Sequence, residues 1–198
     1  DSIEIKNNNG CVEFNLSSLY RRIISILLIF MSTIVLFYQV AIIVYSIRWH
    51  IFKKNMIVVY NEVSFFSSYK ELELFLSNDP GFLTDYAKNL IELTHFEHAI
   101  HLLNKAIKIQ PTQDRFLYLA IAYEAERNYQ LAEKNYQNAV NIIPKRFLPK
   151  YLLYDLYKKN NKTEKAITLA KEIVNYPVKI PSKEIELIKT ELRNYLNQ

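Results

Sequence analysis

The stretch AIHLLNKAIKIQP (residues 99–111) reads as a helix that carries alanine at its first and eighth places and ends at a proline. The first alanine and the proline recur twice more along the chain, at a period of about 33 residues, whereas the second alanine recurs as Ala139 and is replaced by Ile173 in the last copy. A repeat of this length predicts stacked helical hairpins, since one hairpin cannot bury its apolar face alone and needs a neighbour. The repeated alanine is Ala99, Ala132 and Ala166, and the repeated proline is Pro111, Pro144 and Pro177.

An apolar helix is also expected about a dozen residues ahead of each repeated alanine. Its small residue, Ala87 in the first copy and Ala120 in the second, is expected to face the alanine of the helix that follows. Only a small side chain lets two helix axes approach to the lower end of the usual spacing of about 8–10 Å. The larger residues expected to fill the space between hairpins are Tyr86, Leu90, Leu103, Leu119, Tyr123 and Tyr136.

These positions together resemble the tetratricopeptide repeat (TPR), a family of helical-hairpin repeats. The third copy departs from that pattern, because Tyr154 stands where the small residue belongs and the hairpin glycine is absent. Asparagine tolerates left-handed backbone, so we expect Asn128 and the pair Asn160 and Asn161 to make the hairpin turns. The matching residues are Leu83, Tyr86, Ala87, Leu90, Ala99, Leu103, Ala106 and Pro111 in the first copy; Phe116, Leu119, Ala120, Tyr123, Ala132, Tyr136, Ala139 and Pro144 in the second; and Leu153, Tyr154, Tyr157, Ala166, Ala170, Ile173 and Pro177 in the third.

Composition places the chain among helical proteins. Half of its 198 residues are hydrophobic, and only two are glycine and six proline, too little turn punctuation for a many-stranded β protein. The net charge is +5, but acidic residues are interspersed among the lysines, so no basic stripe indicates a nucleic-acid partner. The one cysteine, Cys11, cannot form an internal disulfide and is interpreted as an idle thiol.

Residues 23–47 contain no charged side chain, and Gln39 is the single strongly polar group in their interior. At a rise of about 1.5 Å per residue, such a helix covers the roughly 30 Å hydrocarbon core of a bilayer. Arg48, Trp49 and His50 follow it, an arrangement typical of a membrane interface. The sequence therefore predicts a transmembrane helix, with a buried core helix as the alternative. Its orientation stays open, because basic residues flank both ends.

The expected fold class is thus all-α: an N-terminal transmembrane helix, a TPR-like α-solenoid of about three helical hairpins and a C-terminal capping helix. Tyr69 and Leu72 fall where the second helix of a worn repeat would place them, and Ser182 can N-cap the closing helix. The expected segments are 1–22 (polar), 23–47 (transmembrane), 48–79 (connecting helix or half repeat), 80–112, 113–146 and 147–181 (the three repeats) and 182–198 (capping helix).

Few residues in the sequence suggest chemistry. His95, His98 and His101 share one side of a helix, which makes a metal site conceivable, but no cysteine lies nearby to complete a tetrahedral set. We interpret these histidines as part of a solvated surface. The sequence contains no recognisable Ser-His-Asp set or glycine-rich phosphate loop. We therefore expect no catalytic residue, no metal, no cofactor and no enzyme activity in this chain.

The first helices of such a stack line a concave groove that suits an extended segment, so a protein or peptide partner is expected there. The alternative is a groove filled by the chain's own flanking helix. Ile121 and Asp155 stand where a clamp for a terminal carboxylate would need polar or basic groups, which disfavours that ligand. The groove positions are Thr84, Lys88, Ile91, Leu117, Ile121, Glu124, Tyr151, Asp155 and Lys158.

The order of parts also resembles the C-terminal region of O-antigen ligase-like membrane proteins of Bacteroidetes. This resemblance implies the non-catalytic tail of an enzyme of cell-envelope polysaccharide (lipopolysaccharide) biosynthesis. It also implies the bacterial inner membrane, with the repeats on the periplasmic side. The matching motifs are Pro144, Arg146 with Phe147 and Tyr151 to Leu153 before the last hairpin, then Pro177, Val178, Lys179 and Ser182 before the closing helix.

Two function hypotheses remain open from the sequence. The catalytic parts of a ligase would precede Asp1, and the lack of an initiator methionine agrees with a fragment of that kind. The alternative is a free-standing single-span scaffold that assembles envelope proteins. Both hypotheses predict a protein partner for the repeats and a bilayer around residues 23–47, and neither predicts binding to nucleic acid.

Overall fold

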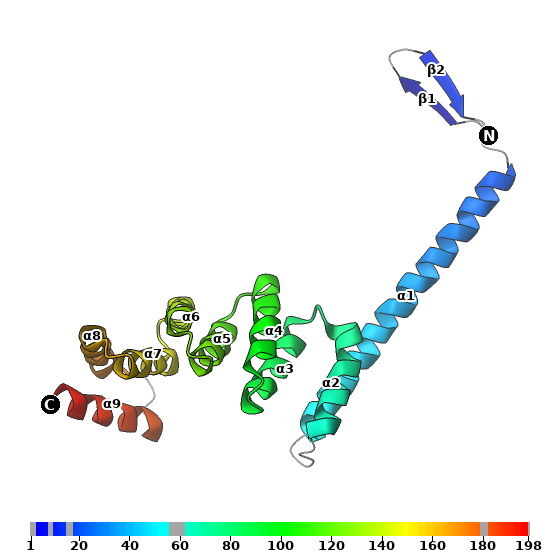
Figure 1. Ribbon diagram of the computed structural model, residues 1–198. Helices are drawn as coiled ribbons and strands as arrows, with labels where there is room; N and C mark the ends of the chain where they lie inside the picture. The colour runs from blue at the N-terminus through cyan, green and yellow to red at the C-terminus, as the bar shows by residue number, and fades with distance from the viewer. Residues whose placement is uncertain (1–2, 8–9, 15–17, 56–61, 179–181, 198) are drawn as a thin grey trace. The chain divides into compact units, whose positions relative to one another are not determined.

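The computed structural model describes residues 3–7, 10–14, 18–55, 62–178 and 182–197. The chain divides into two units, Asp1–Phe65 and Phe66–Gln198, and each is described by itself (Figure 1).

The first unit begins with a β-hairpin. Strand β1 (Ile3–Asn7) pairs antiparallel with β2 (Gly10–Phe14), so that Ile3 lies opposite Phe14 and Asn7 opposite Gly10. From its sequence this region was expected only to be polar, and the hairpin is a difference from that expectation. Alternation of apolar with charged residues along β1 (IEIKN) favours a strand over a helix.

Helix α1 (Ser18–Asn55) follows the hairpin in this unit, which ends within the first turn of the next helix. It is longer than the expected 23–47 at both ends, because the flanking polar residues continue the helix. Between Tyr20 and Lys53 the mean hydropathy reaches 2.5. None of the residues in the most apolar part of this segment is buried by the rest of the chain. By length and composition, α1 is a helix that could cross the roughly 30 Å core of a bilayer.

The second unit is a succession of helices. Their bounds are α2 (Glu62–Leu76), α3 (Pro80–Glu92), α4 (Phe96–Ile109), α5 (Gln113–Ala125), α6 (Tyr129–Ile142), α7 (Phe147–Lys159), α8 (Thr163–Asn175) and α9 (Lys183–Leu196). The expected connecting helix is thus α2, which starts later than the sequence suggested, and residues 56–61 of that expectation lie outside the described residues. Tyr69 and Leu72 of α2 are buried, as their place in a worn repeat predicts.

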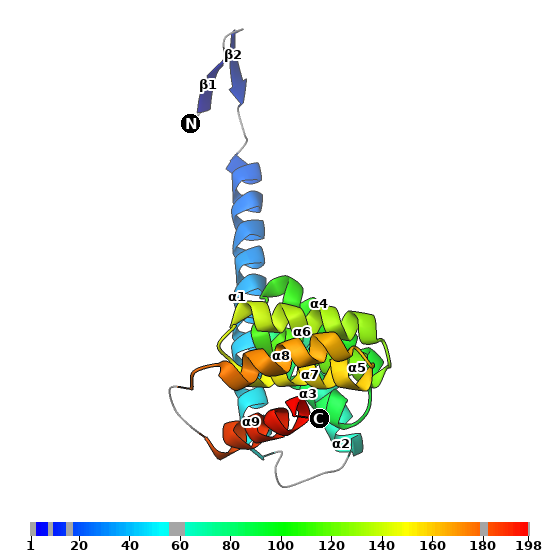
Figure 2. The same cartoon turned by 90° about the vertical axis from the view of Figure 1, so that its left-hand side faces the viewer.

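Three hairpins form the stack, α3 with α4, α5 with α6 and α7 with α8. The second helix of each hairpin also packs against the first helix of the next element, so α4 contacts α5, α6 contacts α7 and α8 contacts α9. The first helices and the second helices lie in two layers (Figures 1 and 2). This arrangement confirms the predicted TPR-like solenoid with its closing helix.

Small residues lie between the two helices of the first and second hairpins, as predicted. Ala87, Ala99, Ala120 and Ala132 are all 0% exposed. Because these side chains end at Cβ, the helices that carry them can pack closely. The larger residues assigned to the space between hairpins are buried as well, except for Tyr123, which is half-buried.

The hairpin turns differ in part from the sequence expectation. Left-handed backbone occurs at Thr94, Arg127 and Asn161, with φ of 62°, 59° and 56°. Each of these residues follows the end of a first helix, where a Schellman motif closes the helix and glycine is the usual occupant. Asn161 was therefore placed correctly, whereas Asn128 and Asn160 have negative φ, of −85° and −96°. The Asn128 side chain instead accepts a hydrogen bond from the Leu131 amide at 3.3 Å and caps α6.

The third hairpin is built around a large residue. Tyr154 replaces the small residue of α7 and is 0% exposed. Its ring lies 5.4 Å from that of Tyr195 on α9, in an edge-to-face arrangement. Among the described residues its buried hydroxyl has no hydrogen-bond partner. The third hairpin therefore exists, as predicted, but its packing includes the closing helix.

Helix α9 is held at the C-terminal end of α8. Ser182 caps α9 by accepting a hydrogen bond from the Ile185 amide at 3.3 Å, as predicted. The buried Lys189 ammonium donates to the backbone carbonyls of Val174 and Tyr176, at 2.9 and 2.7 Å. A cation at this place satisfies carbonyl groups left free where a helix ends.

Candidate protein-binding site

The nine residues predicted for the groove lie on the three first helices, α3, α5 and α7, in equivalent places. Successive repeats bring Thr84, Leu117 and Tyr151 to one level of these helices. A second level holds Lys88, Ile121 and Asp155, and a third holds Ile91, Glu124 and Lys158. The repeat period thus aligns the nine positions along one side of the stack. Their side chains differ in how free they are to meet a partner.

The α3 positions combine one exposed residue with two half-buried ones. Lys88 lies 3.9 Å from Glu92, one turn further along the helix, and half of each side chain is exposed. A surface pair of this kind stabilises a helix by only a few tenths of a kcal/mol, so Lys88 can exchange it for another carboxylate. Ile91 is half-buried. Thr84 is less free, because its hydroxyl accepts a hydrogen bond from Nε of Arg115 at 2.8 Å.

The α5 positions are partly absorbed by the core. Leu117 is only 6% exposed and packs in the hydrophobic cluster of the second and third hairpins, so it does not offer a side chain to a partner. Ile121 is half-buried at the edge of the same cluster. The Glu124 carboxylate accepts hydrogen bonds from the Tyr136 hydroxyl at 2.8 Å and the Lys159 ammonium at 3.0 Å.

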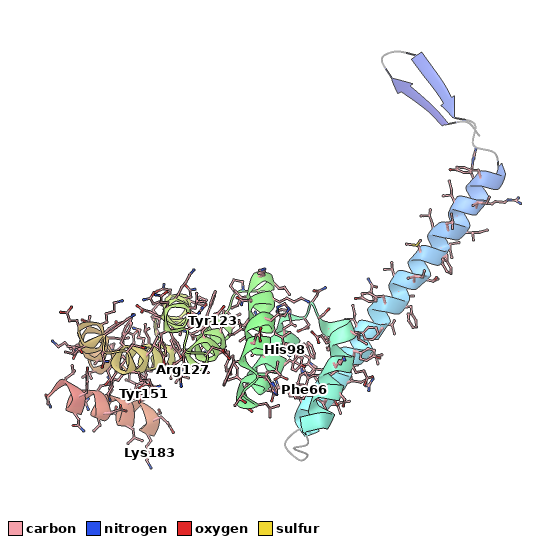
Figure 3. All side chains as sticks on the ribbon, in the orientation of Figure 1. Phe66, His98, Tyr123, Arg127, Tyr151 and Lys183 are labelled. Atoms are coloured by element: carbon pink, nitrogen blue, oxygen red, sulfur yellow. The ribbon has the colours of Figure 1, made fainter. Side chains whose placement is uncertain are left out.

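The α7 positions contact other parts of the chain. The Tyr151 hydroxyl donates to Glu191 of α9 at 2.8 Å, and in Figure 3 Tyr151 lies between α7 and α9. The Lys158 ammonium lies 5.5 Å from the centre of the Tyr195 ring, also on α9. Asp155 pairs with Lys159 at 2.7 Å. The alternative of a groove filled by the flanking helix therefore holds at α7, where α9 covers part of the predicted surface.

Sequence reasoning missed the residues that hold this side of the stack together. Lys159 bridges Glu124 and Asp155, and these two carboxylates raise the pKa of its ammonium group above the usual range. Arg115 is buried and joins α5 to Thr84 and to the end of α4 through Gln110. A charged residue at a regular helical position usually indicates a solvated face. Nothing in the sequence distinguishes Lys159 and Arg115 from other surface charges.

The second helices carry an ion cluster that joins neighbouring hairpins. Glu133 of α6 pairs with Lys162 and, at 2.7 Å, with Lys165, both from the third hairpin. Burial acts to raise the pKa of the Glu133 carboxyl, but the two ammonium groups outweigh it and hold the pKa below the usual range. The Tyr157 hydroxyl also donates to Glu133, at 3.2 Å. This cluster fixes the second hairpin against the third.

Two of the three histidines of the first hairpin make aromatic contacts. The His95 ring packs edge-on against Phe66 at 5.0 Å and the His98 ring against Tyr86 at 5.3 Å. Burial lowers the pKa of His98, which favours its neutral form. Over the residues that the structure describes, no three His, Cys, Asp or Glu side chains are grouped so that they could hold a metal ion.

The fold of the helical unit is similar to that of several solved structures. Two of them are titled crystal structures of MamA. One has a TM-score of 0.58 at 17% identity, covering 77% of this chain and 88% of that one. The other has a TM-score of 0.54 at 17% identity, covering 66% and 82%. A chain of the CopN–Scc3 complex has a TM-score of 0.54 at 16% identity, covering 64% of this chain and 74% of that one. At these identities the likeness concerns the fold.

No curated protein sequence matches the chain. The resemblance to the tail of O-antigen ligase-like proteins receives no support from any of these similarities, whereas the TPR-like repeat does. A family model matches residues 49–177, which is more than half of the chain and includes α2 and all three hairpins. The chain therefore belongs to the ChAPs family, the Chs5p-Arf1p-binding proteins.

Proposed function

We propose that this chain is a membrane-anchored module that binds a protein partner on the exposed side of α3 and α5. The observation that carries the proposal is the difference in freedom among the aligned positions. Lys88 makes an exposed surface pair with Glu92, and Ile91 and Ile121 are half-buried, whereas Tyr151 and Lys158 contact α9. Ile91 and Ile121 provide an apolar strip, and Lys88 provides a positive charge that can exchange its weak ion pair for another carboxylate. This combination suits an extended peptide with apolar side chains and an acidic residue.

The similarities support a partner that is a protein. The family is named for binding two proteins, and one structural neighbour is titled as a complex. The repeat architecture adds a physical reason, because each hairpin offers the same helix face at a regular step along the stack. Chs5p and Arf1p belong to the family name, and for this chain we propose only that the partner is a protein.

The membrane part of the proposal rests on α1. Most apolar side chains of α1 are exposed, so little of the chain itself buries them. The hydrocarbon core of a bilayer provides the apolar surroundings that such a helix needs. Flotation of the chain with phospholipid vesicles in a density gradient tests this. The chain is expected to float with the vesicles and to stay in the membrane fraction after an alkaline wash. A chain that stays in the dense fraction would rule out the anchor.

Site-specific photocrosslinking in the native host tests the binding face. A photoreactive amino acid at Lys88 or Ile91 is expected to trap one protein, which mass spectrometry identifies. The matched control is the same amino acid at Lys134, which is exposed on α6 in the other layer. An equal yield of the same adduct from Lys134, or no adduct from either α3 position, would remove the proposed face.

A charge-reversal pair sharpens the same test. Lys88→Glu is expected to weaken binding of the crosslinked partner about threefold to tenfold, by placing two carboxylates, the new one and Glu92, beside an acidic segment. Glu92→Gln leaves the lysine in place and is expected to retain the partner. If both variants bind equally well, the partner is not held by this charge.

The link to O-antigen ligases is a narrower form of the same proposal. It is favoured by the order of an apolar helix before three helical repeats and by the short motifs around Pro144 and Pro177. It would place the chain in a bacterial inner membrane, with the repeats in the periplasm recruiting an acceptor. Further apolar spans encoded upstream of Asp1 would favour this form, and a start codon nearby would favour the free-standing scaffold.

A further inference from the structure

We propose that α1 pairs with α1 of a second copy of this chain inside the bilayer, along the helix face centred on Gln39. This inference rests on the proposed membrane anchor. It concerns a surface separate from the repeats, and it names the partner as an identical chain.

Gln39 is the unusual residue of α1. Its carboxamide lies near the middle of the apolar segment Tyr20–Lys53, is exposed, and has no partner among the residues that the structure describes. Three hydroxyl side chains of the apolar segment, Ser25, Ser32 and Thr33, are satisfied within the helix. The Ser32 hydroxyl donates to the Ile29 carbonyl at 2.8 Å and the Thr33 hydroxyl to the Phe30 carbonyl at 2.8 Å.

An amide in this position is costly in hydrocarbon unless another group pairs with it. Lipid tails offer neither a donor nor an acceptor, so polar side chains in spanning helices turn toward another protein surface. The glutamine side chain has both a donor and an acceptor, so two facing glutamines satisfy each other. This self-complementarity favours a second copy over a helix of different sequence.

The residues around Gln39 fit a seam between two helices. Ser25, Ser32 and Ser46 fall at multiples of a heptad from Gln39, and from Ser25 to Ser46 the helix rises about 32 Å. A period of seven keeps one stripe of a helix facing its partner in a left-handed pair. Small side chains let the backbones approach, as in other packed membrane helices. The stripe therefore spans the whole roughly 30 Å hydrocarbon core.

In the proposed pair the two α1 helices run in the same direction across the bilayer. A parallel two-fold pair brings each residue of the seam opposite its own copy, which places the two Gln39 amides together. This direct pairing of identical residues is the feature that the experiment below tests.

Energy transfer between labelled copies of the full chain tests the pairing. Cys11 is the chain's single cysteine, so a thiol-reactive donor or acceptor dye attaches at one position before reconstitution into phosphatidylcholine and phosphatidylglycerol vesicles. Wild-type chain is expected to show transfer that falls when unlabelled chain is added. Gln39→Leu is expected to raise the dissociation constant within the bilayer about threefold to thirtyfold, and Gln39→Asn to restore most of the pairing.

Matched controls separate the seam from the rest of the helix. Ser32→Leu is expected to weaken pairing by forcing the backbones apart, whereas Phe37→Leu, on another side of α1, is expected to leave transfer unchanged. Absence of transfer in the wild type would overturn the proposal. Transfer that is unchanged by Gln39→Leu would also overturn it, because the copies would then associate elsewhere.

Flotation of every variant keeps this inference distinct from the membrane anchor. A chain that floats with the vesicles but fails the energy-transfer test retains its anchor and loses only the pairing. A chain that does not float disproves the anchor, and with it the pairing inside a bilayer.

Discussion

The second and third hairpins share a register but reach a packed state in different ways. In the second, Ala120 of α5 and Ala132 of α6 are both fully buried. In the third, Tyr154 occupies the place of Ala120 and is also fully buried, beside Tyr195 of α9. A repeat position is thus defined by the space around it, and a large residue is accommodated when another element completes the packing.

The two hairpins also differ in how they relate to α9. Ala120 and Ala132 of the second hairpin share a hydrophobic cluster with Leu192 of α9. The third hairpin depends on α9 through Tyr151, Tyr154 and Lys158. The closing helix is therefore part of the third repeat's core as well as a cover for the end of the stack.

Alkaline pH is expected to produce the largest change, because it unfolds the stack. Burial raises the pKa of Tyr154 and Tyr151 to about 12, and burial with Glu124 raises the pKa of Tyr136 further. A folded pKa above the unfolded value of about 10 means that stability is full below pH 10 and is lost as the pH rises toward 12. Tyrosinate absorbance and circular dichroism should change together in this window. Full ionisation by pH 10 with the helices intact would contradict it.

Removing the large residue of the third hairpin tests whether it fills its space. Tyr154→Ala is expected to lower the free energy of unfolding by about 3–5 kcal/mol, since it leaves a cavity where three helices meet. Urea denaturation of the detergent-solubilised chain, followed by circular dichroism, measures the loss. Tyr123→Ala, at a half-buried tyrosine of α5, is the control and should cost clearly less. Equal costs would mean that Tyr154 is not a core residue.

Placing the tyrosine in the second hairpin tests the converse. Ala120→Tyr is expected to cost about 1–3 kcal/mol, because the close contact with Ala132 leaves no room for a ring. The same denaturation measures it. Ala125→Tyr, at an exposed place on the same helix, should change stability by less than about 0.5 kcal/mol. A neutral Ala120→Tyr would show that the two helices are not closely packed.

Two hydroxyl deletions give the smallest effects, with opposite signs. Tyr136→Phe is expected to cost about 1–2 kcal/mol, because the Glu124 carboxylate loses a hydrogen bond at 2.8 Å. Tyr154→Phe removes a buried hydroxyl that has no partner among the described residues, and is expected to stabilise the chain by about 1 kcal/mol. Thermal unfolding of both variants checks the signs. A destabilised Tyr154→Phe would indicate an ordered water at that hydroxyl.

Much of the repeat could be predicted because it depends on residue size at fixed spacing. Ala87, Ala99, Ala120 and Ala132 are recognisable from the sequence, since a small residue that recurs at one helical position indicates close packing there. The turns were harder to predict. Left-handed backbone falls on Thr94 and Arg127, which carry no such preference, because closure of the helix end by the hairpin outweighs the local cost.

The candidate site was predicted by position but not by environment. The period placed nine residues on one side of the first helices, and all nine fall within α3, α5 and α7. Whether each is free depends on partners distant in the chain: Lys159 for Glu124, Glu191 for Tyr151 and Arg115 for Thr84. These contacts have no local signature, because charged and hydroxyl side chains are equally common on solvated faces.

The sequence by itself determined that this protein has a run of helical hairpins, preceded in the chain by a helix apolar enough for a bilayer. Both properties depend on side-chain size and polarity that repeat along the chain. These patterns can be read from the sequence without coordinates. Tertiary structure alone decided that α9 completes the third hairpin and which of the nine groove positions are tied to side chains elsewhere in the chain. Those outcomes depend on which distant side chains meet, and a linear pattern does not contain that information.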